Sequence, residues 1–459
     1  MYEILQKLFH LKENKTTLNT EVVAGVTTFM TMAYILAVNP NILSTTGMDA
    51  GAVFVATAVG SALGTIFMAL LANYPFALAP GMGLNAFFAF AVCGAMGYSW
   101  QVALAAVFVE GLLFIVMSLT PIRETLFNCI PMSLKLGVSA GIGLFIAFIG
   151  MQGAKLVVDG PTLVTMYPFK AALADGTFQT TGIGAVLCLI GVVVTVALMY
   201  KKVTGDILLG IVITWVLGII CELLGIYVPN PEMGVFSLIP DFSHGISFDN
   251  VASTVGQMDF SMIGSFEFIS IVLAFMFVDL FDTLGTLIGV ASKADMLDKE
   301  GKLPNIKGAL LADSLATTAG AVLGTSTVST YVESSAGVSV GGRTGLTAIV
   351  VAVLFLLSLF LAPLFLTIPA FATAPALIVV GFLMMGSITK IDFSDITEAF
   401  PAYIAVTTMA FTYSISEGIS LGVISYVVIN TLSGAFKKKN ISWVMYLLAL
   451  IFIMKYIFV

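Results

Sequence analysis

The stretch Gly324–Gly342, GTSTVSTYVESSAGVSVGG, is a polar interruption in a chain that is otherwise strongly hydrophobic. Thr and Val favour extended backbone and Gly breaks helices, so the stretch predicts an extended segment and not a continuous helix. Its one charged residue is Glu333. Irregular backbone at membrane depth is tolerated only where it is buried in protein or lines a cavity. The interpretation of this stretch therefore depends on what surrounds it.

The composition indicates a membrane protein. The 459 residues are 59% hydrophobic and 10% charged, and the mean hydropathy is +1.06, whereas a soluble domain carries about 25% charged residues. Apolar runs follow one another along the chain, as a hydrocarbon layer of about 30 Å requires. Because backbone polar groups in lipid must be paired internally, we predict an all-α polytopic fold. The four cysteines stand singly, without the spacing of a disulfide framework or a metal site.

Fourteen transmembrane segments are expected, and the third and tenth are short. They fall at about residues 21–40, 50–72, 82–93, 99–119, 132–152, 180–200, 205–226, 265–292, 304–323, 331–340, 344–366, 374–389, 401–414 and 416–434. A last apolar run, 441–459, contains Lys455 and follows three lysines. It fits a helix on the membrane surface and an extra span equally well.

The cationic residues predict the orientation, because Lys and Arg are enriched in cytoplasmic loops. The long loop 227–261 contains acidic residues but no Lys or Arg, so we place it outside. The N-terminus is then cytoplasmic in a multi-pass protein of the cell membrane. The residues that fall on the inner side are Lys7 to Lys15, Arg123, Lys201, Lys202, Lys293, Lys299, Lys302, Lys307, Arg343, Lys390 and Lys437 to Lys439.

The two short segments occupy matching places in two halves of seven. The first is introduced by NYPFALAPGMGLNAFFAF, residues Asn73–Phe90, and the second is the opening stretch. A constant offset of 248 places Asn85 on Glu333, Tyr34 on Asp282 and Thr31 on Asp279, although few residues are identical. Since seven is odd, the halves must have opposite orientations, as in the inverted repeats of transporters whose broken helices form the binding site.

Acidic residues at membrane depth each cost about 2.5–3.5 kcal/mol on insertion scales, so each needs a structural or functional reason. Glu222, Glu267 and Glu417 lie near outer ends and fit a solvated role. Glu110 and Asp313 fit either proton handling or bonds that brace neighbouring helices. The full set at this depth is Glu110, Glu222, Glu267, Asp279, Asp282, Asp313, Glu333 and Glu417.

Asp279 and Asp282, in AFMFVDLFDTLGT, are three residues apart and therefore share one helix face. Two such carboxylates would not both stay ionised in a dry interior, which favours a water-filled cavity or a shared proton, although bracing of adjacent segments stays open. Glu333 lies in the weakest stretch of backbone, where a functional role is the better hypothesis.

No enzyme motif competes with a transport function. GxSxG, HExxH and GxxxxGK[ST] are absent, and His10 and His244 fall outside the expected spans. We expect a protein that is not an enzyme, with no cofactor, metal or nucleic-acid partner. Any proton relay would have to use carboxylates.

Four motifs together resemble the azaguanine-type hypoxanthine/guanine/adenine permeases, within the nucleobase/ascorbate transporter superfamily. The similarity is collinear over about residues 15–435. The motifs are VVAGVTTFMTMAYILAVNP (Val22–Pro40), APGMGLNAFF (Ala79–Phe88), FVDLFDTLGTLIGVA (Phe277–Ala291) and GTSTVSTYVESSAGV (Gly324–Val338).

The resemblance implies the fold of the bacterial uracil permease, a seven-plus-seven inverted repeat with a core and a gate domain. It implies proton symport of purine bases, with the proton as coupling ion, and the superfamily suggests a homodimer. The implied division is a cytoplasmic segment 1–20, core 21–120 and 262–366, gate 121–226 and 367–435, an outer loop 227–261, and the last segment 436–459.

One departure from the wider superfamily bears on the substrate. The Gln-x-His of the first segment in xanthine/urate permeases is replaced by TTFMTMAY, so xanthine, urate and ascorbate are less expected than hypoxanthine, guanine or adenine.

Matching the motifs places the substrate-binding positions on Asn85, Asp279, Asp282 and Glu333. A carboxylate can accept two adjacent N–H donors, so we assign such a clamp on the base to Glu333. Asn85 suits the O6/N7 edge or holds Glu333, Asp279 binds from the other side, and Asp282 sets affinity or senses protons. Candidate ring contacts are Phe87, Phe88 and Phe281, and candidate proton-coupling residues are Asp282, Glu333, Glu110 and Asp313.

Oxopurines are slightly favoured over adenine, which lacks an N1–H donor. An adenine-specific permease, an anion transporter of the sulfate-exchanger type and a channel or scaffold are the alternatives. The anion transporter would need a cationic or neutral site, whereas the expected site is acidic.

Overall fold

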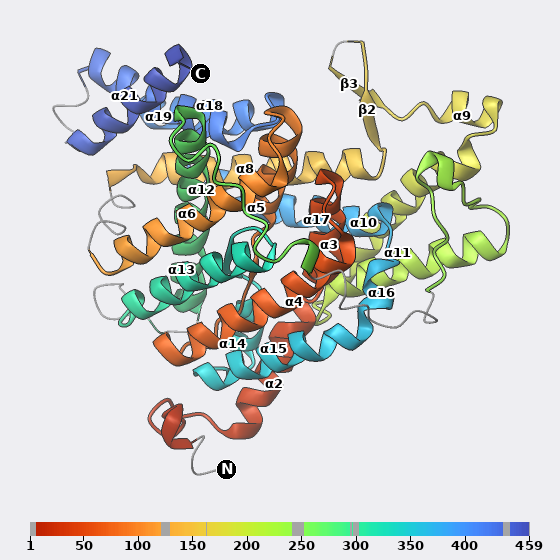
Figure 1. The fold of residues 1–459 in the computed structure, drawn as a ribbon, viewed down its shortest axis with the longest axis horizontal. Coiled ribbons are helices and arrows are strands. Elements are labelled where there is room, and N and C mark those ends of the chain that lie inside the picture. The colour runs from red at the N-terminus through yellow and green to blue at the C-terminus, as the bar shows by residue number, and fades with distance from the viewer. Residues whose placement is uncertain are drawn as a thin grey trace.

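A computed structural model describes residues 6–120, 129–161, 163–240, 252–293, 296, 303–434 and 441–458 (Figure 1). The fold is an all-helical bundle with four very short strands. In the described parts, ten helices are long and apolar enough to cross a membrane. Some residues named in the sequence analysis fall outside these ranges. They are Arg123, His244, Lys299, Lys302, Lys437 to Lys439 and the last residue of the 441–459 run.

The first half of the chain supplies six of the ten candidate spans, which are Leu18–Thr46, Ala50–Ala72, Trp100–Ser118, Met132–Gly153, Phe178–Tyr200 and Asp206–Leu223. Its elements are α2 (Leu18–Met32), α3 (Ile35–Leu43), η1 (Ser44–Thr46), α4 (Ala50–Phe67), η2 (Met68–Ala72), β1 (Leu78–Pro80), α5 (Met82–Ala86), η3 (Phe87–Ala95), α6 (Trp100–Ser118), α8 (Met132–Gly153), β2 (Val157–Asp159), β3 (Val164–Met166), α9 (Phe169–Asp175), η4 (Phe178–Gly182), α10 (Ile183–Tyr200), α11 (Asp206–Leu223) and η5 (Pro231–Met233).

The second half supplies the other four, Ile306–Leu323, Gly345–Leu366, Ala370–Lys390 and Ile415–Leu432. Its elements are α12 (Phe266–Lys293), α13 (Ile306–Leu323), β4 (Val328–Thr330), α14 (Ser334–Ser339), α15 (Gly345–Ser358), η7 (Leu359–Leu361), α16 (Ala362–Leu366), α17 (Ala370–Met385), η8 (Gly386–Lys390), α18 (Ile396–Phe411), α19 (Ile415–Leu432) and α21 (Trp443–Phe458).

The expected segments outside these ten are helices of other lengths. The 28-residue α12 covers the expected segment at 265–292. Met82–Ala95 and Ile396–Phe411 are shorter apolar helices. The expected segment at 331–340 contains only α14, with six residues. The third and tenth segments are thus short, and each has a strand before its helix.

These two strands pair with each other. β1 and β4 are antiparallel, with Leu78 opposite Thr330 and Pro80 opposite Val328. Pro80 and Val328 are also related by the 248-residue offset, as expected if a pseudo-twofold axis passes between them. Gly81 N–H donates to the Thr327 carbonyl at 3.0 Å, and Tyr331 N–H donates to the Ala77 carbonyl at 3.0 Å. The breaks of the two halves therefore satisfy each other's backbone groups in a buried place.

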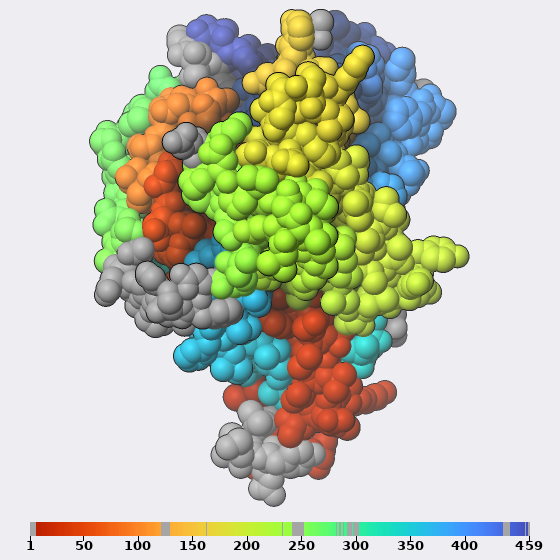
Figure 2. All heavy atoms as spheres, turned by 90° about the vertical axis from the view of Figure 1, so that its right-hand side faces the viewer, coloured from red at the N-terminus to blue at the C-terminus, as the bar shows by residue number. Residues whose placement is uncertain are grey.

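Helices from the two halves interleave, and α14 and α15 lie beside α2 (Figure 1). The contact of α14 with α2 leaves no room for a side chain at Gly337. A Cβ there would lie 2.1 Å from Thr28 Oγ1 and 2.5 Å from the Ala24 carbonyl oxygen. The hairpin β2–β3 and helices α9 to α11, coloured yellow to yellow-green, form much of the face shown in Figure 2.

The C-terminal helix α21 runs alongside α19 in the opposite direction. The hydroxyls of Tyr446 and Thr431 are 3.1 Å apart, and Tyr456, nearly three turns further on, hydrogen-bonds to Glu417. The ring of Phe452, one turn before Tyr456, packs against Phe277 of α12, with centroids 5.7 Å apart. α21 therefore contacts both α19 and α12.

The close contact of α14 with α2 yields a stability test. We expect Gly337→Ala to lower the free energy of unfolding by about 1–3 kcal/mol, because backbone of α2 cannot yield to the new methyl group. The measurement is the Tm of the purified protein in detergent. Gly386→Ala is the matched control, since a Cβ at Gly386 meets nothing within 4 Å. Equal Tm values for both variants would contradict the packing described.

Candidate functional site

The candidate site lies where β4 ends and α14 begins, against a break in the first membrane segment. α2 ends at Met32 and α3 begins at Ile35, so Tyr34 stands between two helices. The Tyr34 hydroxyl donates to Glu333 Oε1 at 2.7 Å. The Thr31 hydroxyl lies 3.4 Å from the Glu333 carbonyl oxygen, and it also donates to the Thr28 carbonyl at 2.7 Å. The first segment thus contacts both the backbone and the side chain of Glu333.

Asp282 approaches the same crossing from α12. The Ser329 hydroxyl of β4 donates to Asp282 Oδ2 at 3.0 Å. A Cβ at Gly81, the residue after β1, would lie 3.4 Å from that oxygen. Gly81 and Ser329 are related by the 248-residue offset. Asp282 therefore lies against both crossing segments.

Accessibility divides the five carboxylates that the sequence singled out for site or proton roles. Asp282 and Glu333 are only partly buried, whereas Glu110, Asp279 and Asp313 have no exposed surface. A solute reaching the crossing in this conformation could contact the first pair and not the other three.

Asp279 and Asp313 belong to a buried hydroxyl–carboxyl network behind the crossing. The Thr283 hydroxyl lies 3.0 Å from Asp279 Oδ1 and 3.0 Å from Asp313 Oδ2. Thr330 N–H of β4 donates to Asp313 Oδ1 at 3.2 Å. The network therefore ties α12 and α13 to the strand that carries the chain toward Glu333.

Asn85 and Glu110 also bind the stretch that precedes β4. The Ser326 hydroxyl hydrogen-bonds to Asn85 Oδ1, and the Thr327 hydroxyl donates to Glu110 Oε2 at 3.0 Å. Asn85 Nδ2 reaches the Pro80 carbonyl at 3.4 Å. In the described structure Asn85 thus fixes the crossing through Ser326 and Pro80, without a bond to Glu333.

Two of the candidate ring contacts, Phe87 and Phe88, lie away from accessible space. Phe87 and Phe88 are fully buried and pack against Phe275, with ring centroids 4.8 and 6.4 Å away. The side chain of Phe281 is outside the described part of the structure. Phe87 and Phe88 therefore have no exposed ring surface to offer a base.

Sequence reasoning did not assign a role to Tyr34, Ser329 or Tyr331. The Tyr331 hydroxyl donates to the Pro80 carbonyl at 2.5 Å and so joins the two breaks. Ser329 and Tyr331 lie inside the polar stretch Gly324–Gly342, and that position could have identified them as candidates. Tyr34 carried two signals, its place in the motif Val22–Pro40 and its alignment with Asp282 by the 248-residue offset.

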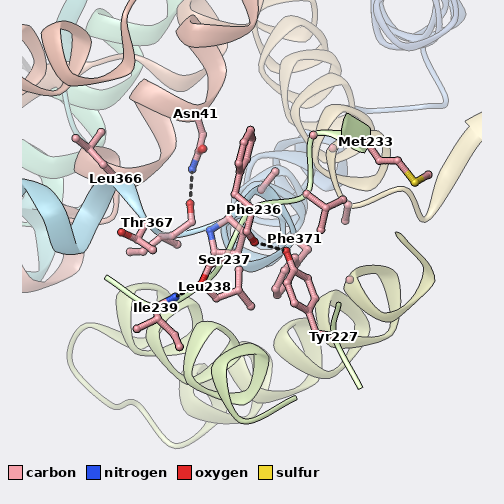
Figure 3. Close-up of a pocket in the computed structure, with 18 of the residues that line it drawn as sticks. Asn41, Tyr227, Met233, Phe236, Ser237, Leu238, Ile239, Leu366, Thr367 and Phe371 are labelled. Atoms are coloured by element: carbon pink, nitrogen blue, oxygen red, sulfur yellow. Dashed lines mark hydrogen bonds between the residues drawn. The ribbon is translucent and has the colours of Figure 1, made fainter. Parts of the chain in front are cut away.

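A large cavity lies elsewhere, at ends of helices that the sequence places outside (Figure 3). It has a volume of about 900 Å³ and is lined by Tyr227, Phe236 and Phe371, with Asp49 and Lys155 as its ionisable side chains. Its walls are held by two bonds that Figure 3 shows, Asn41 Nδ2 to the Ile368 carbonyl at 3.0 Å and the Tyr227 hydroxyl to the Phe236 carbonyl at 2.9 Å. None of the predicted site residues lines it.

The architecture is that of a known class of membrane transporters. The transmembrane domain of the cyanobacterial bicarbonate transporter BicA superimposes with a TM-score of 0.62 at 16% identity, covering 88% of this chain and 97% of that one. At this identity the match establishes a shared fold, an all-helical membrane domain.

The sequence comparisons define the family. The Xan_ur_permease model, described as "Permease family", matches residues 19–421. The chain belongs to this permease family, as its motifs had indicated, and is a multi-pass membrane transport protein, not an enzyme. It is 44% identical over 436 residues to the guanine/hypoxanthine permease PbuO of Bacillus subtilis, covering 94% of this chain and 96% of that protein. It is 42% identical over 459 residues to the adenine permease AdeP of Escherichia coli, covering 99% and 96%.

The buried network yields a second stability test. We expect Thr283→Val to lower the free energy of unfolding by about 1–3 kcal/mol, because both buried carboxyl groups lose a hydrogen-bonding hydroxyl. The measurement is the Tm in detergent. The control is Thr407→Val, which removes a partly exposed hydroxyl that bonds only carbonyls of its own helix. An unchanged Tm for Thr283→Val would show that the network contributes no stability.

Proposed function

We propose that the protein imports purine nucleobases across the cell membrane, with Glu333 and Asp282 holding the base. The observation that carries this proposal is the pair of partly accessible carboxylates at the β1–β4 crossing. Permeases whose names specify guanine, hypoxanthine or adenine are 42–44% identical over nearly the whole chain, which supports the same substrate class here.

The chemistry of the base fits an acidic site. Hypoxanthine and guanine are neutral and present N1–H, an imidazole N–H and, in guanine, a 2-amino group. Carboxylates accept such donors in charge-assisted hydrogen bonds. Glu333 is the main acceptor in this proposal, and Asp282 accepts from a second edge or sets affinity. Asp279 and Asn85, which are buried in this conformation, act by holding the crossing in shape.

The architecture proposed for transport is two inverted halves of seven segments, forming a core and a gate, with a cytoplasmic N-terminus. The shared offset of Pro80 with Val328 and of Gly81 with Ser329 supports the repeat. The course of α21 along α19 supports a fifteenth span for the last helix. A homodimer through the gate domains is part of the same proposal.

The coupling ion in this proposal is the proton. A hydroxyl has one proton, so Thr283 can donate to only one of Asp279 and Asp313 at a time. The second contact would be satisfied if the other carboxyl group were protonated and donated to the Thr283 oxygen. β4 connects this network to Glu333. Asp313 is therefore the favoured relay residue beside Asp282 and Glu333, with Glu110 as an alternative.

The anion-transporter alternative rests on the fold alone. Among the described residues, no Lys or Arg side chain forms a salt bridge with Asp282 or Glu333. An anion would meet two carboxylates at the crossing, so this alternative is disfavoured. Adenine stays a candidate substrate because its imidazole N–H could also bind a carboxylate.

The first transport test removes the charge of Glu333. In cells lacking their own purine carriers, we expect Glu333→Gln to reduce the uptake of labelled hypoxanthine and guanine at least tenfold, because a hydrogen bond to a charged acceptor is worth about 1.5–3 kcal/mol. The control is Asp392→Asn, an exposed carboxylate bonded to Ser394. If Glu333→Gln took up the bases at the wild-type rate with an unchanged KM, the assignment of Glu333 to the binding site would be contradicted.

The second transport test concerns the coupling ion. We expect purine uptake to alkalinise a weakly buffered medium and to stop when a protonophore is added, because each base enters with a proton. A pH electrode and labelled hypoxanthine give both readings on the same cells. Uptake that requires sodium and resists the protonophore would contradict proton coupling while leaving the purine assignment standing.

A further inference from the structure

Tyr34 is buried where the first half of the chain reaches the carboxylate of Glu333. Its side chain is 1% exposed. The hydroxyl bond to Glu333 Oε1 is the only one the structure records for it within the described residues. Because a buried tyrosine hydroxyl needs a partner, the fold has directed it to one oxygen of an accessible carboxylate.

The Glu333 carboxylate is bound unevenly. Oε1 accepts from Tyr34, whereas no side chain among the described residues is recorded as donating to Oε2. The backbone of Glu333 is held as well, since its carbonyl faces the Thr31 hydroxyl at 3.4 Å and Gly337, four residues on, is pressed against α2. The glutamate is therefore fixed at its backbone and at one oxygen, and the other oxygen is left for a ligand.

We propose that Tyr34 is a positioning residue that makes Glu333 a single acceptor for the base and thereby sets the choice between purines. This inference rests on the proposed purine transport. A glutamate loses up to about 2 kcal/mol of side-chain entropy when it is ordered, and Tyr34 removes that cost from substrate binding. With the tyrosine on the Oε1 side, a planar base that approaches edge-on meets Oε2.

The chemistry separates hypoxanthine from guanine. Hypoxanthine presents N1–H alone on that edge, and one oxygen is enough to bind it. Guanine presents N1–H beside a 2-amino group, a pair of donors that would suit both oxygens of an unoccupied carboxylate. A carboxylate oxygen has two lone pairs, and Tyr34 already donates to one of those on Oε1. The second donor of guanine would therefore share Oε1 with Tyr34 and gain less than at an unoccupied carboxylate, so the wild-type protein should distinguish the two bases weakly.

The test is the variant Tyr34→Phe, which keeps the ring and removes the hydroxyl. We expect the KM for hypoxanthine to rise about tenfold, as for the loss of a hydrogen bond to a charged group. The KM for guanine should rise less than about threefold, because the released oxygen can accept its 2-amino group, and Vmax should change less than KM. The wild-type KM values for the two bases should agree within about threefold.

The matched control is Tyr426→Phe. Tyr426 is also a buried tyrosine whose hydroxyl donates to a glutamate, Glu398, at 3.3 Å, but on α19 and away from the crossing. It should leave both KM values unchanged. The amount of each variant in the membrane and its Tm in detergent are measured in parallel.

Three results would overturn the inference. Unchanged KM values in Tyr34→Phe would exclude positioning, and an equal rise for both bases would indicate a general structural role. If Tyr34→Phe did not fold, the wild-type comparison would still test the single-acceptor geometry, and guanine binding more than about tenfold tighter than hypoxanthine would contradict it. Absence of any purine uptake by the wild-type protein would instead refute the proposed function itself.

Discussion

The structure depends on one constraint, that backbone polar groups inside a membrane must find partners within the protein. An unpaired backbone group in hydrocarbon costs several kcal/mol. In two segments of this chain the helix is interrupted by a short strand at membrane depth. Each strand alone would leave backbone groups without hydrogen-bond partners. The antiparallel pair β1–β4 resolves the problem, because each break supplies the partners of the other. The two halves can therefore reach this arrangement only together.

The same crossing explains where the polar side chains gather. Residues of the stretch around β4 bind acidic or amide groups on four different elements: Ser326 binds Asn85, Thr327 binds Glu110, Ser329 binds Asp282 and Thr330 binds Asp313. Most of these partners are buried and brace the strand. Glu333 and Asp282 keep accessible surface, so the bracing groups hold two carboxylates in a defined place.

The sequence predicted the class of fold and the position of its breaks from strong signals. Composition alone indicates many membrane helices, and the runs of Ser, Thr, Gly and Pro mark where helices must stop. The partner of each polar residue was not predictable, because the contacts join residues up to about 300 positions apart and depend on the register of β1 against β4. Asp279 illustrates the limit. Its spacing from Asp282 puts both on one helix face, yet only the structure shows that Thr283 and Asp313 enclose it.

Aromatic residues were the least predictable part of the site. The chain has 35 phenylalanines, so a ring contact is hard to select from sequence. Phe87 and Phe88 were chosen as candidates, and the structure buries both against Phe275. Tyr34, which does reach the site, stands in an apolar segment far from the other motifs. Tyr34 lies at the break between α2 and α3. The two residues of this break are Ala33 and Tyr34, and neither type predicts the end of a helix as Gly or Pro would.

The central claim is that the base binds at the crossing of the two broken segments. A cryo-electron microscopy structure of the protein with hypoxanthine bound tests it most directly. We expect density for the base within hydrogen-bonding distance of Glu333, beside Asp282 and the end of β4. Density for the base in the cavity lined by Phe236 and Phe371, with the crossing empty, would contradict the claim.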